Sequence, residues 1–230
     1  MRFGLQKLTL LDYPGKVACT VFSCGCNLRC PFCHNAPLVL GDDSALPVDT
    51  EELLTFLTGR RKVLDAVCMT GGEPLLHREM PELLLRIKEM GYLVKLDTNG
   101  TLPDALEKVV NSGAVDLVAM DIKNSPAKYQ ETCGRQVDMA QIRQSVDFLR
   151  NGKTGYEFRT TVVDGLHTVE DISAIGEWIA GAAAYYLQSF VDSGEILIHN
   201  IPMGAVDDAT MQAMLNAVLP FVPAAQIRGR

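Results

Sequence analysis

Long hydrophobic runs and clusters of positive charge are missing from this 230-residue sequence. Polar residues interrupt the apolar residues of the N-terminal stretch, so we expect neither a membrane span nor a signal peptide. The net charge is −7, and the scattered Lys and Arg residues offer no electrostatic footprint for nucleic acid or an anionic lipid surface. The sequence therefore predicts a cytoplasmic protein with neither a nucleic-acid nor a membrane partner.

The chain also lacks an even number of cysteines, since it has seven. Secreted scaffolds held by disulfides are usually smaller and pair their cysteines, so reduced thiols or metal thiolates fit this chain better. Cys19 and Cys68 lie in apolar, strand-like runs, where cysteine behaves as a small hydrophobic residue. Cys133 also stands alone, and the four other cysteines gather between residues 24 and 33.

Short apolar runs alternate with amphipathic segments, which is the rhythm of strands and helices in a parallel α/β fold. The strand-like runs are 17–23, 65–70, 92–97, 116–121, 157–163 and 185–190. The helix-like segments are 50–60, 79–90, 103–112, 139–150, 168–180 and 207–218, the first behind a capping-box pattern of Asp49 and Glu52. Each helical crossover returns the chain in the same direction, so we expect a parallel sheet. That sheet is either a closed or partial β/α barrel or an open doubly wound sheet, and no linker marks a second domain.

Polar motifs follow the first four strand-like runs. They are the cysteine group at 24–33, "TGGEP" at 70–74, "DTNG" at 97–100 and "DIK" at 121–123. Ligand sites of parallel α/β folds gather beyond the carboxyl ends of the strands. The sequence therefore predicts one site, built from these four segments.

The spacing of Cys26, Cys30 and Cys33 indicates what the cysteine loop can hold. Structural zinc usually takes two separated pairs of ligands, and adding Cys24 to the three others fits such a site poorly. A [4Fe–4S] cluster offers four irons, so three cysteines on a short loop leave one iron with an open coordination position. The spacing favours the cluster over zinc.

These three cysteines, with Phe32 before the last one and a strand before the loop, resemble the defining motif of the radical S-adenosylmethionine (SAM) superfamily. The resemblance implies an α/β fold, a single-domain partial (β/α)6 barrel over residues 1–230, with the cluster loop at 24–35 and a C-terminal extension at about 195–230. It also implies that the open iron of the [4Fe–4S] cluster binds SAM. Reductive cleavage of SAM then gives a 5′-deoxyadenosyl radical, which takes hydrogen from a substrate.

The same resemblance assigns cofactor contacts to the other motifs. Gly71 and Gly72 would let the backbone approach SAM closely, and Glu73 would accept hydrogen bonds from its ammonium group. The backbone of His34 is expected against the adenine. The full set of expected cofactor-binding residues is Phe32, His34, Gly71, Gly72, Glu73, Pro74, Asp97, Thr98, Asn99, Asp121, Lys123, Arg159 and His199.

Within the superfamily, "CHN" after the last cysteine, "DTNG" and "DIK" resemble glycyl-radical-enzyme activases. That resemblance implies a monovalent cation near the SAM carboxylate, held by Asp97, Thr98 and Asp121. Lys123 would pair with the same carboxylate and counts, with the three cysteines, as a catalytic residue. Arg159 is expected to contact either the cofactor or a substrate peptide.

The stretch "LTLLDYPGKVACTVF" at 8–22, with "YYLQSF" and the terminal "IRG", resembles the activating proteins of anaerobic ribonucleoside-triphosphate reductase. We therefore expect an oxidoreductase that generates a glycyl radical on that reductase, with an electron donor such as flavodoxin or ferredoxin. The alternatives are an activase of another glycyl radical enzyme, of the pyruvate formate-lyase type, and a radical SAM enzyme acting on a small molecule. A zinc-binding interaction module is the alternative outside the superfamily.

Four residues near these motifs have less defined roles. Cys24 is expected to be inert, with a redox-sensitive thiol or a fourth thiolate ligand as alternatives. His199 is either a structural histidine or a contact to the ribose or adenine. His77 and His167 are expected in solvent or at a helix start.

Overall fold

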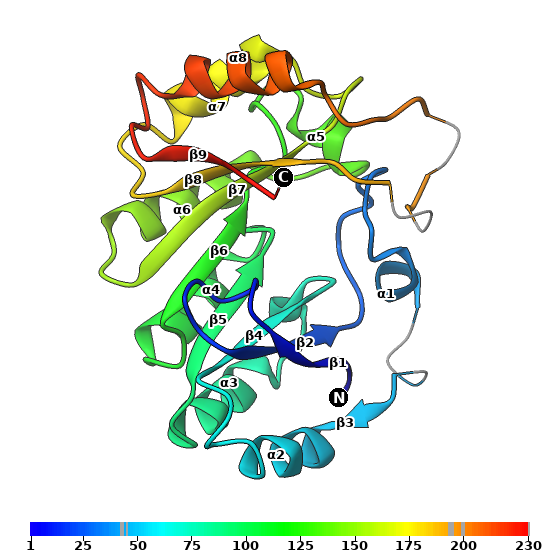
Figure 1. Ribbon diagram of the computed structural model, residues 1–230, viewed down its shortest axis with the longest axis vertical. Helices are drawn as coiled ribbons and strands as arrows, with labels where there is room; N and C mark the ends of the chain where they lie inside the picture. The colour runs from blue at the N-terminus through cyan, green and yellow to red at the C-terminus, as the bar shows by residue number, and fades with distance from the viewer. Residues whose placement is uncertain (42–43, 45, 193–195, 199–200, 230) are drawn as a thin grey trace. The chain divides into compact units, whose positions relative to one another are not determined.

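The computed structural model describes residues 1–41, 44, 46–192, 196–198 and 201–229. In this part of the chain, nine strands follow the order β3-β1-β2-β4-β5-β6-β7-β8-β9. The chain divides into two compact units (Figure 1). Unit 1 consists of residues 1–27, 37–98 and 102–119, and unit 2 consists of residues 28–36, 99–101 and 120–230. No helix among the described residues is both long and apolar enough to cross a membrane.

Unit 1 contains the strands that carry the first three motifs. Its strands are β1 (Arg2–Thr9), β2 (Ala18–Ser23), β3 (Val48–Asp49), β4 (Ala66–Gly71) and β5 (Leu93–Thr98). Strand β1 runs antiparallel to β2 and β3, whereas β2, β4 and β5 are parallel to one another. The register places Ser23 beside Gly71 at the carboxyl ends of β2 and β4. The segments that follow β2 and β4 therefore leave the sheet at the same edge.

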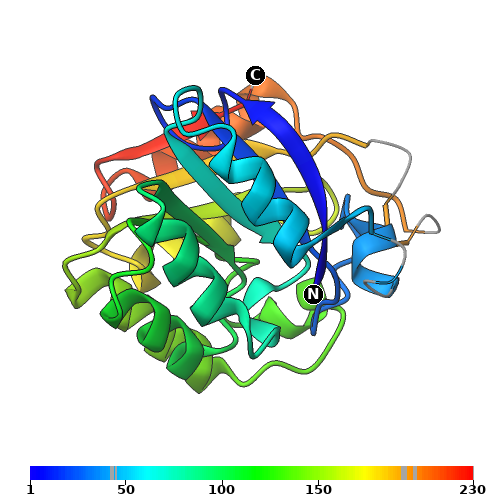
Figure 2. The ribbon, with the colours of Figure 1, turned by 90° about the horizontal axis from the view of Figure 1, so that it is seen from below.

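The helices of unit 1 are α1 (Ala36–Leu40), whose first residue belongs to unit 2, α2 (Thr50–Thr58), α3 (Met80–Glu89) and α4 (Pro103–Asn111). The expected capping box is confirmed, because Asp49 accepts from the Glu52 backbone while Glu52 accepts from the Asp49 backbone. Figure 2 shows α2, α3 and α4 beside one another on one side of the strands. They bury leucine-rich faces there, with Leu53, Leu54 and Leu57 from α2, Leu83, Leu84 and Ile87 from α3, and Leu106 and Val109 from α4.

Unit 2 holds the end of β6 (Leu117–Asp121) and the strands β7 (Gly155–Val162), β8 (Tyr185–Ser189) and β9 (Ala225–Arg228). Its helices are α5 (Tyr129–Cys133), α6 (Met139–Asn151), α7 (Val169–Trp178) and α8 (Asp208–Val218). Strands β7, β8 and β9 are parallel, and α8 contacts β8 and β9 (Figure 1). Gly176 of α7 allows a close approach to α8, since a Cβ atom there would lie 2.9 Å from Val218.

The two faces of β7, β8 and β9 differ in polarity, because side chains alternate along each strand. One face is built from Phe158, Thr160, Val162, Tyr185, Leu187, Ala225 and Ile227. The other face, here called the polar face, is built from Glu157, Arg159, Thr161, Tyr186, Gln188, Gln226 and Arg228. A sheet with one apolar and one polar face packs its helices on the first and leaves the second for water or ligands.

The predicted α/β fold with a parallel sheet is confirmed. All six strand-like runs and all six helix-like segments form the expected elements within a few residues of the expected ends. Strands β1, β3 and β9 and helices α1 and α5 were not expected from the sequence. A single domain with its boundaries at 1–230 stays a prediction.

Candidate functional site

The part of the cysteine loop that belongs to unit 2 is fixed by backbone hydrogen bonds. The Cys33 N–H donates to the Cys30 carbonyl at 3.1 Å, which closes a turn between the two thiols. The Arg29 N–H donates to the Cys133 carbonyl at 2.9 Å, and the Ile198 N–H donates to the Pro31 carbonyl at 3.1 Å. The loop is therefore held from both sides by segments distant in sequence.

The part of the loop that belongs to unit 1 is fixed around Cys24. Its thiol is buried and donates to the carbonyl groups of Leu38 and Gly41, each at 3.1 Å. The His77 ring lies 2.8 Å from the Cys24 carbonyl oxygen through Nε2. His77 is half-buried and bonded rather than in solvent, and its carbonyl accepts from the N–H of Met80, the first residue of α3, which fits the expected helix start. These contacts fix the backbone two residues before Cys26.

The electrostatic environment of Cys30 favours a thiolate. A hydrogen bond from the Cys133 thiol, supported by the charge of Lys123, lowers the pKa of Cys30 to about 7 although burial opposes the charge. Burial raises the pKa of Cys33, with partial relief from a hydrogen bond to the Asn35 backbone. Thiolates are the form in which cysteine binds metal.

The donor set of the loop fits an iron–sulfur cluster. All seven cysteines are free thiols, so Cys26, Cys30 and Cys33 are not committed to disulfides. No three His, Cys, Asp or Glu side chains of the described residues converge closely enough to hold one metal ion. A [4Fe–4S] cluster has no such requirement, because each cysteine binds a different iron. Three separate thiols on one short loop are therefore the appropriate ligands.

Both glycines of "TGGEP" permit a close approach of the backbone after β4 to the backbone after β2. Gly71 has φ +114°, and a Cβ atom there would lie 2.3 Å from the Ser23 carbonyl oxygen. A Cβ atom on Gly72 would lie 1.9 Å from the carbonyl oxygen of Gly25. Glycine is therefore required at both positions to let the two backbones pack closely, one residue before Cys26. This structural requirement is separate from the expected contact with SAM.

The Glu73 side chain is fully buried, and two neutral groups donate to its Oε1. Its Oε1 accepts from the Leu75 N–H at 3.1 Å and from the Thr98 hydroxyl at 3.0 Å. The first bond makes Glu73 the N-cap of the short 3-10 helix Pro74–Leu76. The structure thus brings Glu73, Pro74 and Thr98 of the predicted set together in unit 1.

Asp97 and Asn99, at and just after the end of β5, already have intramolecular partners. The Lys95 ammonium lies 2.7 Å from Asp97 Oδ1, and the Lys95 side chain is only 3% exposed. Asn99 Oδ1 accepts from the Thr101 N–H at 3.0 Å and from the Thr101 hydroxyl at 2.6 Å. Asn99 therefore builds a turn, and a monovalent cation at Asp97 would share that carboxylate with Lys95.

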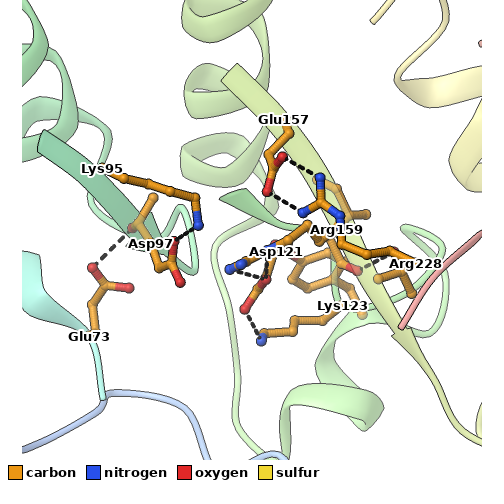
Figure 3. A network of polar contacts seen from close by, with 12 residues as sticks. Glu73, Lys95, Asp97, Asp121, Lys123, Glu157, Arg159 and Arg228 are labelled. Carbon is orange, nitrogen blue, oxygen red and sulfur yellow. Dashed lines mark hydrogen bonds and ion pairs between the residues drawn. The ribbon is translucent and has the colours of Figure 1, made fainter. Parts of the chain in front are cut away.

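Asp121 stands between two cations in unit 2. Its carboxylate lies 2.8 Å from the Lys123 ammonium and 3.0 Å from the Arg159 guanidinium (Figure 3). Burial disfavours the charged carboxylate, but Lys123 and then Arg159 outweigh burial and lower the pKa of Asp121 to about 2. Two cations and one anion leave this cluster with a net positive charge. The cluster is suited to binding a carboxylate.

His167 supports the same cluster. It precedes the N-cap of α7 as expected, but its ring is buried rather than in solvent. Nδ1 accepts from the Val163 N–H at 3.1 Å, so Nε2 carries the proton and donates to the Lys123 carbonyl at 2.8 Å. The ring also meets Phe32 edge to face, with centroids 6.5 Å apart. His167 therefore connects the backbone after β6 with the cysteine loop.

Two further predicted cofactor residues are histidines. The His34 ring stacks on Phe190 with centroids 5.4 Å apart, just beyond the end of β8. His199 lies outside the described residues, so the choice between a structural histidine and a cofactor contact stays open. The cofactor roles of the individual residues stay predictions, whereas the positions of the described ones on the cysteine loop, at and after the ends of β4, β5 and β6, and on β7 are observed.

Comparison with known proteins gives the family. Residues 20–179 match the family model of the radical SAM superfamily. The chain is 33% identical over 195 residues to MJ1227 of Methanocaldococcus jannaschii, named as a candidate glycyl-radical enzyme activating enzyme, and the match covers 81% of this chain and 78% of the relative. It is 34% identical over 126 residues to the pyruvate formate-lyase-activating enzyme of Clostridium pasteurianum, covering 53% of this chain and 51% of that protein.

The fold is also similar to that of a solved structure. The crystal structure of Streptococcus suis SuiB bound to S-adenosylmethionine matches with a TM-score of 0.71 at 15% identity, covering 90% of this chain and 49% of SuiB. Proteins of the matched superfamily use a [4Fe–4S] cluster and SAM, and the chain has the cysteines for the cluster. The chain therefore belongs to the radical SAM superfamily, among the glycyl-radical enzyme activating enzymes.

Proposed function

We propose that this enzyme generates a glycyl radical on anaerobic ribonucleoside-triphosphate reductase. The choice of this partner is supported by the stretch at 8–22, which resembles the activating proteins of that reductase. The choice of a protein as substrate is carried by one structural observation, the polar face of unit 2. A pyruvate formate-lyase type enzyme is the second candidate partner, which the similarity to the C. pasteurianum protein favours.

Cys26, Cys30 and Cys33 would hold the cluster. When bound, the cluster supplies the electron that cleaves SAM. The remaining cysteines stand singly or beside this group, so the sequence offers no second site of the same kind. The electron would therefore come from a separate carrier protein, such as flavodoxin or ferredoxin.

The amino-acid end of SAM has an ammonium and a carboxylate, and the chain offers a matching group for each. Glu73 would accept from the ammonium, because the Leu75 N–H and the Thr98 hydroxyl fix the position of its Oε1 and a carboxylate forms strong hydrogen bonds with an ammonium. Lys123, with Arg159 behind Asp121, would bind the carboxylate through the net positive charge of that cluster. Phe32 and His34, on the loop between and after the cysteines, would exclude water from the adenosyl part.

The polar face suits a peptide main chain. Two of its charged residues are paired with each other, since Arg228 forms two hydrogen bonds with Glu157 at 2.7 and 2.8 Å. The Arg228 guanidinium also lies 3.4 Å from the centre of the Tyr186 ring. Paired charges reduce the attraction for an ionic ligand while leaving hydrogen-bonding groups for amides. A glycine would fit the reacting position, since no side chain shields its α-carbon.

The test mixes the reduced, iron-loaded protein with SAM and anaerobic ribonucleotide reductase of the same cell. We expect a glycine-centred radical on the reductase by electron paramagnetic resonance (EPR), and its loss when the acceptor glycine is changed to alanine. A radical formed on a pyruvate formate-lyase type enzyme instead would establish the second candidate. Turnover of a small molecule, with no radical on either protein, would contradict the proposal.

A further inference from the structure

Lys95 is a buried lysine in the middle of β5. Side chains at alternate positions of a strand share one face, so Leu93, Lys95 and Asp97 lie on the same side of the sheet. The Lys95 side chain is 3% exposed, and its ammonium lies 2.7 Å from Asp97 Oδ1 at the strand end (Figure 3). A lysine is seldom buried this deeply unless its charge is paired. Two residues of one strand therefore form a buried ion pair at the predicted site.

An apolar cluster covers the same face of the sheet toward the amino ends of the strands. It consists of Tyr13, Ala18, Ala66 and Cys68, with Leu93 and Leu117 packed against it. Cys68 lies beside Lys95 in the register of β4 and β5. Burial raises the pKa of the Cys68 thiol, so this neighbour stays neutral and supplies no counter-ion. The Asp12 carboxylate, which also acts on Cys68, accepts from the Thr20 hydroxyl. The apolar cluster thus shields the Lys95 ammonium on one side, and Asp97 pairs with it on the other.

The carboxylates expected to hold a monovalent cation already have cationic partners from their own unit. Asp97 Oδ1 is bound by the Lys95 ammonium in unit 1. In unit 2, Asp121 has one oxygen on Lys123 and the other on Arg159. A potassium or sodium ion at Asp97 would share that carboxylate with an ammonium, and like charges repel strongly where protein excludes water. These side chains therefore fit an added monovalent cation poorly.

The end of β5 still needs a positive charge. Thr98, the residue after Asp97, donates to Glu73 Oε1 at 3.0 Å, and Glu73 is the proposed acceptor for the SAM ammonium. The same strand end thus supports one carboxylate and carries a second. A bare Asp97 would repel the carboxylate of SAM as that end of the cofactor binds. A cation on Asp97 removes this repulsion, and Lys95 supplies one.

We propose that the Lys95 ammonium takes the place of the expected monovalent cation, so that this enzyme binds SAM without added potassium or sodium. The inference rests on the proposed binding of SAM at Glu73 and Lys123. Lys95 acts through Asp97 and is therefore a positioning residue. An ammonium has the single charge of such an ion and three hydrogen-bond donors. Because it is attached to the strand, its presence does not depend on the salt of the medium.

The first test uses the parent protein. Titration calorimetry on the iron-loaded protein measures the dissociation constant for SAM with tetramethylammonium as the only added cation, and again with potassium in its place at equal ionic strength. Tetramethylammonium keeps the ionic strength but is too large and too poor a donor to replace potassium. We expect equal dissociation constants in the two salts. Clearly tighter binding in potassium would overturn the inference, because a cation site would then exist beside Lys95.

The second test removes the ammonium. Lys95→Ala leaves space for an ion, and we expect its dissociation constant for SAM to rise about tenfold in tetramethylammonium and to recover in potassium. Lys95→Met removes the charge but fills the space, so we expect the same loss with less recovery. Lys88→Met is the matched control, since it removes another lysine–aspartate pair of unit 1, between Lys88 and Asp116. It should bind SAM as the parent does in both salts.

A recovery in potassium separates replacement of the charge from loss of packing. A folded Lys95→Ala protein that binds SAM as tightly as the parent in tetramethylammonium would overturn the inference. So would a loss of affinity that potassium leaves unchanged, because packing would then explain it. If the unpaired Asp97 prevents folding, the double variant Lys95→Ala with Asp97→Asn removes both charges and should bind SAM equally in the two salts. A potassium requirement in the double variant would contradict the role of Asp97.

Failure of the proposed function has a different signature. A parent protein that binds no iron, or that binds iron but no SAM in either salt, would overturn the proposed function. A parent protein that binds SAM only in potassium would overturn the role of Lys95 and leave the proposed function intact. The two failures are therefore distinguishable before any activity is measured.

Discussion

Two carboxylates at strand ends, the buried Glu73 in unit 1 and the partly exposed Asp121 in unit 2, differ in the groups that donate to them. Glu73 Oε1 accepts from a backbone N–H and a hydroxyl, both neutral. Asp121 is bound by Lys123 and Arg159, both cations. The Leu75 N–H and the Thr98 hydroxyl orient Glu73 Oε1, whereas Lys123 and Arg159 place two positive charges beside Asp121. The first arrangement suits recognition of an ammonium and the second suits recognition of a carboxylate, which are the two charged groups at the amino-acid end of SAM.

The largest expected effect comes from removing the iron–sulfur cluster. Cys30→Ala should abolish SAM cleavage and iron binding, because two thiols cannot hold the cluster, while the cores of both units stay intact. Iron analysis measures cluster binding, circular dichroism measures whether the fold is intact, and a cleavage assay measures SAM turnover. Cys24→Ala is the matched control and should retain iron, since the Cys24 thiol is bonded to backbone carbonyl groups of Leu38 and Gly41. Full cleavage activity in Cys30→Ala would contradict the ligand assignment.

Glu73→Gln tests whether Glu73 recognises the ammonium group of SAM. The amide keeps the shape of the side chain and one carbonyl acceptor for Leu75 and Thr98, but loses the charge. We expect the dissociation constant for SAM to rise about ten- to a hundredfold, which corresponds to roughly 1–3 kcal/mol. Titration calorimetry on the iron-loaded protein measures this dissociation constant. Decarboxylated SAM, which keeps the ammonium, should be affected equally, and an unchanged affinity for both ligands would reduce "GGEP" to a structural turn.

Lys123→Met tests whether Lys123 recognises the carboxylate group of SAM. We expect a smaller effect than for Glu73→Gln, because Arg159 still binds Asp121. The dissociation constant for SAM should rise about tenfold, the loss of one charge-assisted contact. Decarboxylated SAM should bind with unchanged affinity. Lys128→Met removes another lysine–aspartate pair of unit 2, between Lys128 and Asp171, and should change neither value. Equal weakening of both ligands by Lys123→Met would show that Lys123 does not recognise the carboxylate.

Local patterns explain what could be predicted from the sequence. The six strands and six helices have clear periodicity and end signals, and the site motifs follow directly after strands, so both could be located. Strand β1 was missed because Gln6 and Lys7 interrupt its alternation of apolar and polar residues. Helix α5 has five residues and β9 has four, too few to show a period.

Contacts between distant segments account for what could not be predicted from the sequence. Cys133 looked like an isolated cysteine, and only the packing of α5 on the cysteine loop brings its carbonyl to the Arg29 N–H. His167 follows a glycine-containing turn and resembles a solvent residue, yet its two ring nitrogens are both used between β6 and β7. In both cases the partner is remote in sequence, so residue spacing has no information about it. The signal that remains in the sequence is only the residue type, a cysteine or histidine next to an apolar segment.

The smallest expected effect is a pH dependence that belongs to Asp121. Lys123 and Arg159 outweigh burial and hold the pKa of Asp121 at about 2, against an ordinary value of 3.8. Because the folded pKa is the lower one, the ionised carboxylate stabilises the fold fully above about pH 4, and this contribution is lost as the pH falls through about 2. Urea unfolding of the parent protein and of Asp121→Asn should therefore show a stability gap that narrows across this window. The other carboxylates titrate equally in both proteins, so their contributions cancel in the difference between the two free energies of unfolding. A gap that stays constant down to about pH 2 would mean that the two cations do not stabilise the charge of Asp121, and the contrast with Glu73 would lose its basis.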